Sequence, residues 1–168
     1  AALADAVEHE MPVEGARHGE WLSFAQTWAE LNVLAAEIGS GPDRDVVERV
    51  ATLRARVDTR FSEWLQQRFG SLSSLPATAP VMVHHITRFL AGQCAAVGKV
   101  ALVVVDGMAF DQWLVIRHEI SLERPSWRFD ENAVFAWVPT ITSVSRQSIF
   151  AGKAPLYFPS SIYSTDRE

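Results

Sequence analysis

The stretch "KVALVVVDG", residues 99–107, decides the predicted fold, because the chain changes there from helical periodicity to an unbroken apolar run. Residues 100–105 are all apolar and mostly β-branched, which is typical of a strand covered on both faces in a parallel sheet. Asp106 and Gly107 end the run far short of the about 20 apolar residues that a membrane-spanning helix needs. We therefore predict a buried strand here and no transmembrane segment.

The residues after this run predict a helix, a second strand and a second helix. The segment 108–120, "MAFDQWLVIRHEI", predicts a helix, and 128–138, "RFDENAVFAWV", predicts a second strand. The segment 143–152, "SVSRQSIFAG", predicts a second helix that Gly152 ends. Strand, helix, strand and helix in this order indicate an α/β domain with a parallel sheet.

The N-terminal part of the chain has helical periodicity instead. Apolar residues recur every three or four positions in 21–38 and again in 46–69, with glycine and proline between the two runs, which predicts an antiparallel helical hairpin. The segment 70–80, "GSLSSLPATAP", has the composition of a linker, and a helix is expected after it. We therefore expect a helical segment at 1–75 and, at 76–168, the first part of a parallel-sheet domain.

Composition and charge narrow the class of protein. The 168 residues carry a formal net charge of −5 with scattered Lys and Arg, which does not favour nucleic-acid binding through phosphate neutralisation. Cys94 is the one cysteine, so no internal disulfide or thiolate zinc site is expected, and a reducing cytoplasm fits. The chain starts "AALADAVEHE", without Met or a leader, and reads as a piece of a longer protein.

Asp106 is the first candidate for chemistry, because it follows the first predicted strand directly. The carboxyl ends of parallel strands line the ligand crevice of an open α/β sheet. A carboxylate at that position either caps the next helix or ligates a metal, with Gly107 permitting close approach of the backbone. Position alone leaves both roles open.

Hydroxyl side chains gather at the equivalent place after the second predicted strand. Pro139 stops that strand, and Thr140, Thr142 and Ser143 then stand where a helix begins. Free N–H groups and the helix dipole favour an anion at such a point. The simpler alternative is that one of the hydroxyls only caps the helix. Paired with a metal-binding carboxylate, a hydroxyl here is suited to phosphoryl transfer.

The two segments "VALVVVDGMAFDQW", residues 100–113, and "PTITSVSRQSIFAG", residues 139–152, resemble the PglZ domain of bacterial BREX and Pgl phage-defence systems, a branch of the alkaline phosphatase superfamily. The resemblance covers about residues 80–168. It implies an alkaline-phosphatase-like parallel-sheet fold and two divalent metal ions, usually zinc. It also implies Asp106 as a metal ligand and Thr142 as the nucleophile that also contacts metal, with Thr140 as the competing nucleophile. Superfamily members take further Asp and His ligands from downstream, and all five histidines here precede Thr142.

Other residues have weaker claims. Arg146 lies one helical turn after Thr142 and could bind phosphate together with Ser143, although a salt bridge is the alternative for the arginine. His84 and His85 point in different directions on a helix and are expected to be core or surface residues rather than joint metal ligands. Asp111 is expected to stabilise the first turn of its helix. The six tryptophans are expected mainly in the core.

Two functions follow from these residues and from the resemblance. The first is a cytoplasmic, metal-dependent phosphatase or phosphodiesterase of a phage-defence system, which hydrolyses a phosphate ester or diester through Thr142. A nucleotide, a nucleic-acid end and a phosphoprotein are all open as its substrate. The second is a catalytically inactive phosphatase-like scaffold that binds other proteins of a defence complex. Neither function is expected to involve binding to a membrane.

Overall fold

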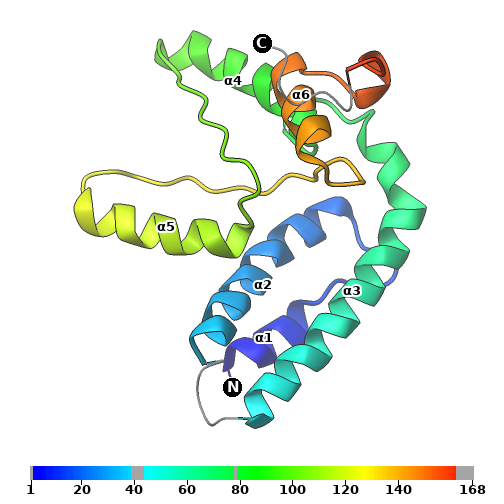
Figure 1. The fold of residues 1–168 in the computed structure, drawn as a ribbon, viewed down its shortest axis with the longest axis vertical. Helices are drawn as coiled ribbons and strands as arrows, with labels where there is room; N and C mark the ends of the chain where they lie inside the picture. Colours follow the sequence, from blue (N-terminus) through cyan, green and yellow to red (C-terminus); the bar gives the residue numbers. More distant parts are fainter. Residues whose placement is uncertain (1, 39–43, 78, 162–168) are drawn as a thin grey trace. The chain divides into compact units, whose positions relative to one another are not determined.

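The computed structural model describes residues 2–38, 44–77 and 79–161. Figure 1 shows its helices, which are α1 (Ala2–Glu10), α2 (His18–Ile38), α3 (Arg44–Leu72), α4 (Ile86–Val97), α5 (Phe110–Glu123) and α6 (Thr142–Ala151), with short 3₁₀ helices η1 (Val83–His85) and η2 (Pro155–Tyr157). The chain forms two compact units. Unit 1 comprises Ala1–Arg68 and Met108–Ala133, and unit 2 comprises Phe69–Gly107 and Val134–Glu168. None of the helices in the described ranges has the length and apolar character needed to cross a bilayer.

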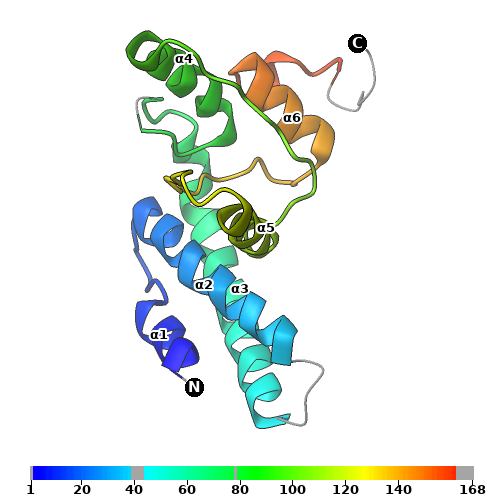
Figure 2. The ribbon, with the colours of Figure 1, turned by 90° about the vertical axis from the view of Figure 1, so that its left-hand side faces the viewer.

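In unit 1, α2 and α3 run antiparallel, as Figures 1 and 2 show from two sides. Trp21, near the start of α2, packs against Phe61 and Trp64 in the later part of α3, with ring centroids 4.9 and 6.0 Å apart. Further along α2, Asn32 accepts a 2.6 Å hydrogen bond from Arg54, earlier in α3. This reversed order of contacts is that of the hairpin predicted from the apolar periodicity.

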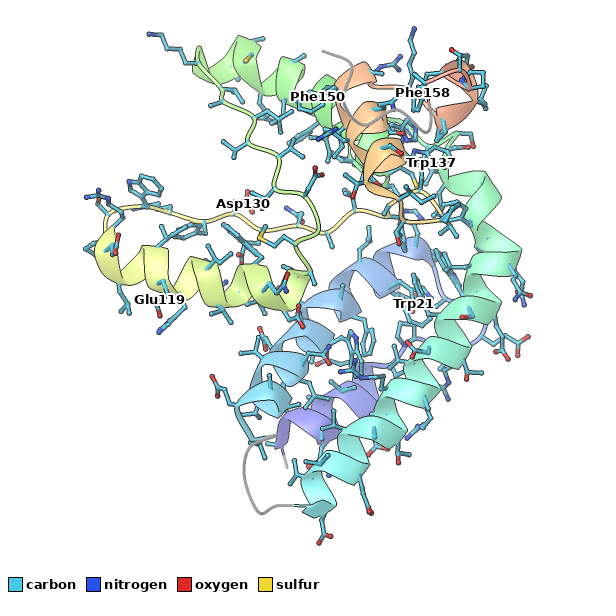
Figure 3. The ribbon with its side chains drawn as sticks, in the orientation of Figure 1. Trp21, Glu119, Asp130, Trp137, Phe150 and Phe158 are labelled. Carbon is cyan, nitrogen blue, oxygen red and sulfur yellow. The ribbon has the colours of Figure 1, made fainter. Side chains whose placement is uncertain are left out.

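Aromatic side chains make the core of unit 1, and Figure 3 shows Trp21 among them. Trp21 and Trp64 are 5 % and 6 % exposed, respectively. The indole N–H of Trp64 donates a 2.8 Å hydrogen bond to the carbonyl of Ala16, in the turn that leads into α2. A buried indole that satisfies its N–H in this way adds both apolar area and a fixed orientation. The expectation of tryptophan in the core is confirmed for these two, whereas Trp127 is 60 % exposed.

The first half of the second predicted strand lies along α5 in unit 1 without forming a strand. Glu131 accepts a 2.5 Å hydrogen bond from the indole N–H of Trp113 and an ion-paired bond from Arg117, both on α5. The ring of Phe129 packs at 6.2 Å from that of Trp113. Side-chain contacts with a helix, rather than backbone contacts with a strand, therefore hold this segment.

Unit 2 is built around η1, α4 and α6. Val83 donates a 3.0 Å backbone hydrogen bond to the carbonyl of Phe135, and Phe135 donates a 2.7 Å bond to the carbonyl of Val81. These bonds make one isolated parallel bridge between Met82 and Phe135. Met82 and Ser148 are fully buried, so η1 and α6 share the core of this unit.

The predicted α/β parallel-sheet fold is wrong, because the described ranges contain helices and this single bridge but no strand. Residues 100–105, predicted as a buried strand, have no regular structure and expose Val103 by 80 % and Val105 by 57 %. A β-strand depends on backbone partners from another segment, and an apolar run by itself specifies none. The helices predicted at 108–120 and 143–152 are confirmed as α5 and α6.

Candidate functional site

The candidate site lies in unit 2, at the N-terminus of α6. Thr142 is the first residue of this helix and is exposed, as is Thr140 before it. The N-cap position belongs to Ile141, whose extended backbone has φ −92° and ψ 134° and whose side chain makes no capping hydrogen bond. None of Thr140, Thr142 and Ser143 is therefore the N-cap residue of this helix.

An apolar N-cap has a chemical consequence for this helix end. Isoleucine is among the poorest N-cap residues, because it offers no acceptor to the first backbone N–H groups. Those groups and the positive end of the helix dipole favour an anion. The exposed Thr142 hydroxyl stands in the same first turn. The local geometry therefore combines a hydroxyl with donors that suit a phosphoryl group.

Ser143 and Arg146, the other two candidate residues on α6, differ in exposure. Ser143 is only 3 % exposed, so its side chain faces the interior of unit 2 rather than solvent. Arg146 lies four residues after Thr142, and positions four apart lie on the same face of a helix. Its side chain is 34 % exposed. Of these two, Arg146 is therefore the one on the face of α6 that carries Thr142.

Asp106 is joined to this face by Arg146. The guanidinium donates a hydrogen bond of 3.3 Å to the Asp106 carboxylate, across 40 positions of sequence. Asp106 stands in a turn with Gly107, whose φ of +67° lies in the left-handed region that glycine adopts without strain. The salt-bridge alternative for Arg146 is thus the one observed, and it brings Asp106 to α6. Direct proximity of Asp106 to the Thr142 hydroxyl stays a prediction.

The helix that follows Asp106 is capped by other residues. Gln112 accepts a 2.9 Å hydrogen bond from the backbone N–H of Ala109, the N-cap of α5. Asp111 accepts a 2.8 Å bond from the backbone N–H of Gln112, which confirms the expectation that it stabilises this first turn. Asp106 is therefore left for a role other than the capping of α5.

The described residues do not make a divalent-metal site by themselves. They contain no group of three or more His, Cys, Asp or Glu placed to hold an ion. Asp106 and Thr142 offer two oxygen-bearing side chains, whereas a stable zinc site takes about four ligands. The Asp106 carboxylate also has a guanidinium beside it, which occupies part of its coordinating capacity. The described residues thus supply only part of the ligands that the expected zinc ions need.

His84 and His85 are core residues of unit 2, 7 % and 4 % exposed. Their rings lie 4.2 Å apart, and the ring of His84 lies 5.2 Å from that of Trp137. Nδ1 of His85 accepts backbone hydrogen bonds from Val81 and Met82 at 3.2 and 3.3 Å, which requires that nitrogen to be unprotonated. Burial lowers the pKa of both histidines, with a further lowering from Arg88. Both imidazoles are therefore structural and neutral.

A cavity of about 260 Å³ lies beside the N-terminus of α6, and the sequence interpretation did not identify it. Its lining is apolar and comes from Trp137–Pro139, from Ile141 and Val144, and from Ala154–Leu156. The signal that could have indicated it is "APLYFP", residues 154–159, where proline and aromatic residues follow the end of α6 instead of the polar residues of an ordinary loop.

Comparison with known proteins gives one finding. Residues 87–165 match the sequence model of the PglZ family, described as the BREX system PglZ alkaline phosphatase-like domain. No curated protein and no solved structure matches the chain. The matched residues include Asp106, Thr142, all of α4 except its first residue, and the whole of α5 and α6. This match at residues 87–165 supports the resemblance to PglZ alkaline phosphatase-like domains that the motifs around Asp106 and Thr142 indicate.

Proposed function

We propose that the protein acts in the cytoplasm as a phosphate-ester or phosphodiester hydrolase of a phage-defence system, with Thr142 as its nucleophile. The observation that carries this proposal is the exposed Thr142 hydroxyl in the first turn of α6, a helix with an apolar N-cap and no side-chain cap. The match of residues 87–165 to an alkaline phosphatase-like domain supports it.

The proposed reaction has two steps. The Thr142 oxygen forms a bond to phosphorus while the bond from phosphorus to the ester oxygen breaks, and the departing alcohol carries away the proton that the hydroxyl loses. Water then attacks the phosphorus of this intermediate and restores the Thr142 hydroxyl, releasing phosphate from a monoester substrate or a phosphate monoester from a diester substrate. The N–H groups at the start of α6 bind the phosphoryl oxygens during both steps.

Arg146 and Asp106 have connected roles in this proposal. Arg146 is a second donor for the phosphoryl oxygens, and in the free protein its charge is balanced by Asp106. Asp106 is the candidate ligand for a divalent cation, which needs further ligands beyond those found among the described residues. Ser143 contributes its backbone N–H rather than its buried side chain.

The test is covalent trapping. The protein is incubated with an activated phosphodiester and zinc, quenched in acid, and mapped by mass spectrometry. A phosphoryl group on Thr142 that still carries the second ester group of the diester, and that is absent from a Thr142→Ala preparation, supports the proposal. Thr140→Ala is the matched control, because Thr140 is also exposed but precedes the helix. Label on Thr140, or on neither threonine under conditions that give turnover, contradicts the assignment of Thr142.

A second candidate function is a phosphatase-like scaffold that binds other proteins of a defence complex. The Asp106–Arg146 ion pair favours it, because a guanidinium next to a candidate metal ligand satisfies the carboxylate without a metal. Under this alternative, Thr142→Ala and Asp106→Ala keep partner binding and phage protection. If either substitution abolishes protection while the folded state is retained, the scaffold function fails.

A further inference from the structure

The segment 134–141, which leads into Thr142 and α6, is joined by a β-bridge to the backbone of residues 81–83. The Val83 N–H donates a 3.0 Å hydrogen bond to the carbonyl of Phe135, and the Phe135 N–H donates a 2.7 Å bond to the carbonyl of Val81. No other β-bridge occurs in the described ranges of the chain. The geometry of residues 81–83 therefore decides whether the backbone before Thr142 is held.

His85 holds residues 81–83 in the shape that this bridge needs. Its Nδ1 accepts backbone hydrogen bonds from Val81 and Met82, at 3.2 and 3.3 Å, and Met82 is fully buried. A protonated Nδ1 is a donor and accepts nothing, so an imidazolium at His85 would place three N–H groups against one another. Protonation thus breaks both bonds at once and leaves two buried backbone donors without an acceptor, which is costly unless water reaches them.

His84 contacts the other side of the same segment. Its ring centroid lies 5.2 Å from that of Trp137 and 4.2 Å from that of His85, and the residue is 7 % exposed. Nδ1 of His84 and the indole nitrogen of Trp137 are buried and have no hydrogen-bond partner among the described residues. Buried polar atoms of this kind gain hydrogen bonds when solvent reaches them. These two atoms therefore favour release of the segment, and the packing of the closed form opposes it.

An imidazolium in this place would find no acid among the described residues of unit 2 except Asp106, which is paired with Arg146. The helices that pack against η1 carry as ionisable side chains Arg88 and Cys94 on α4 and Arg146 on α6. The segments 69–80 and 134–138 carry none. Burial is the largest cause that lowers the pKa of both histidines, and Arg88 lowers both further. For His84, the neighbouring His85 also lowers the pKa, and a backbone hydrogen bond with Ser73 partly offsets these effects.

We propose that His84 and His85 form an acid-sensitive latch: the Met82–Phe135 bridge is closed while both imidazoles are neutral, and protonation of His85 opens it and releases residues 134–141. The released state exposes both histidines to solvent, so it binds protons more readily than the closed state, and a fall in pH favours it. The helices α4 and α6 stay folded in either state. This inference does not rest on the proposed hydrolysis, because it concerns how the segment before Thr142 is held.

The experiment is hydrogen–deuterium exchange of the full chain, followed by mass spectrometry at about pH 7.5 and about pH 5.5, on either side of the ordinary histidine pKa. Exchange rates are corrected for the pH dependence of the chemical step. We expect the protection of the Val83 and Phe135 amides to fall about tenfold for each pH unit over which His85 takes up one proton. The amides of α4 and α6 should keep their protection. Unchanged protection at the bridge, or an equal loss in α4 and α6, overturns the latch.

Substitutions of His85 test the trigger itself. His85→Asn keeps an acceptor oxygen close to the position of Nδ1 without a titrating group, so the bridge should stay protected at both pH values. His85→Ala removes the acceptor, so the bridge should be open at both. His118→Asn is the matched control, because His118 is exposed on α5, and it should keep the pH dependence of the unsubstituted protein. If His85→Asn also keeps that pH dependence, another group is the trigger and the proposal fails.

Discussion

Arg146 donates a 3.3 Å hydrogen bond to Asp106, and this contact joins the two sequence motifs that define the candidate site. The aspartate follows the apolar run 100–105, and the arginine stands on α6, one turn after Thr142. The Asp106 side chain is 44 % exposed and the Arg146 side chain 34 %, so solvent screens their attraction. The pair is thus a weak link that a ligand of either residue can replace.

We predict that Arg146→Gln strengthens the binding of zinc to Asp106 several-fold, because it removes a positive charge next to the carboxylate. The free energy of unfolding should change by only about 0–1 kcal/mol, as is usual for a surface pair. Zinc titration by calorimetry, with denaturant unfolding on the same preparations, checks both expectations. The double variant Arg146→Gln with Asp106→Asn is the control and should bind no more zinc than the single Asp106→Asn variant. Stronger binding in the double variant would place the ion elsewhere.

We predict that the protein loses stability as the pH falls below about 6.5. Burial lowers the folded-state pKa of His84 and of His85 from the ordinary value of 6.5, so the unfolded chain binds more protons than the folded one in this range. The stability that the protein gains by keeping these histidines neutral is therefore complete above about pH 6.5, and it decreases as the pH falls below that value. Each histidine contributes at most about 1.4 kcal/mol per pH unit to the slope of the free energy of unfolding against pH.

The measurement is the free energy of unfolding from about pH 5 to about pH 8, because histidine titrates in this range. His84→Phe should flatten the dependence, since phenylalanine keeps ring packing against Trp137 without a titrating group. His118→Gln is the control, because His118 is exposed on α5. An unchanged slope in His84→Phe would show that this histidine does not contribute to the pH dependence.

We predict opposite effects of alanine at two glycines of unit 2. Gly152 ends α6 with φ +60°, and an added Cβ would lie 2.9 Å from the hydroxyl oxygen of Thr87, so Gly152→Ala should destabilise by about 1–2 kcal/mol. Gly92 lies inside α4 with nothing within 4 Å of an added Cβ, so Gly92→Ala should stabilise by about 0.5–1 kcal/mol. Thermal unfolding of the two variants checks the signs, and a shared sign would contradict the backbone explanation.

We predict that Trp64→Phe destabilises unit 1 by about 1–3 kcal/mol. The smaller ring leaves space in a core position that is 6 % exposed, and the Ala16 carbonyl loses its 2.8 Å hydrogen bond. Trp127→Phe is the matched control and should change the free energy of unfolding by less than about 0.5 kcal/mol, because Trp127 is 60 % exposed. Denaturant unfolding followed by circular dichroism compares the two, and an equal loss would mean that Trp64 adds no more than a surface tryptophan.

The sequence by itself determined α2, α3, α5 and α6, because the signals for these helices are local. Apolar residues at three- and four-residue spacing predict α2 and α3, and glycine at the C-terminus predicts the end of α6. The motifs around Asp106 and Thr142 also predict the family, which the match at residues 87–165 confirms. The roles of these two residues remain proposals, since a family motif does not supply the ligands or substrate that give a residue its function.

Only the tertiary structure decided what surrounds those motifs. The run 100–105 has the composition of a buried strand, but a strand needs a second backbone at hydrogen-bonding distance, and the described residues place none beside it. The pairing of Arg146 with Asp106 and the cavity that Trp137 and Leu156 line likewise join residues that are distant in sequence or separated by a helix. Local periodicity reports which face of an element is apolar, whereas contacts between elements depend on how the chain closes its loops, and no short stretch of sequence contains that information.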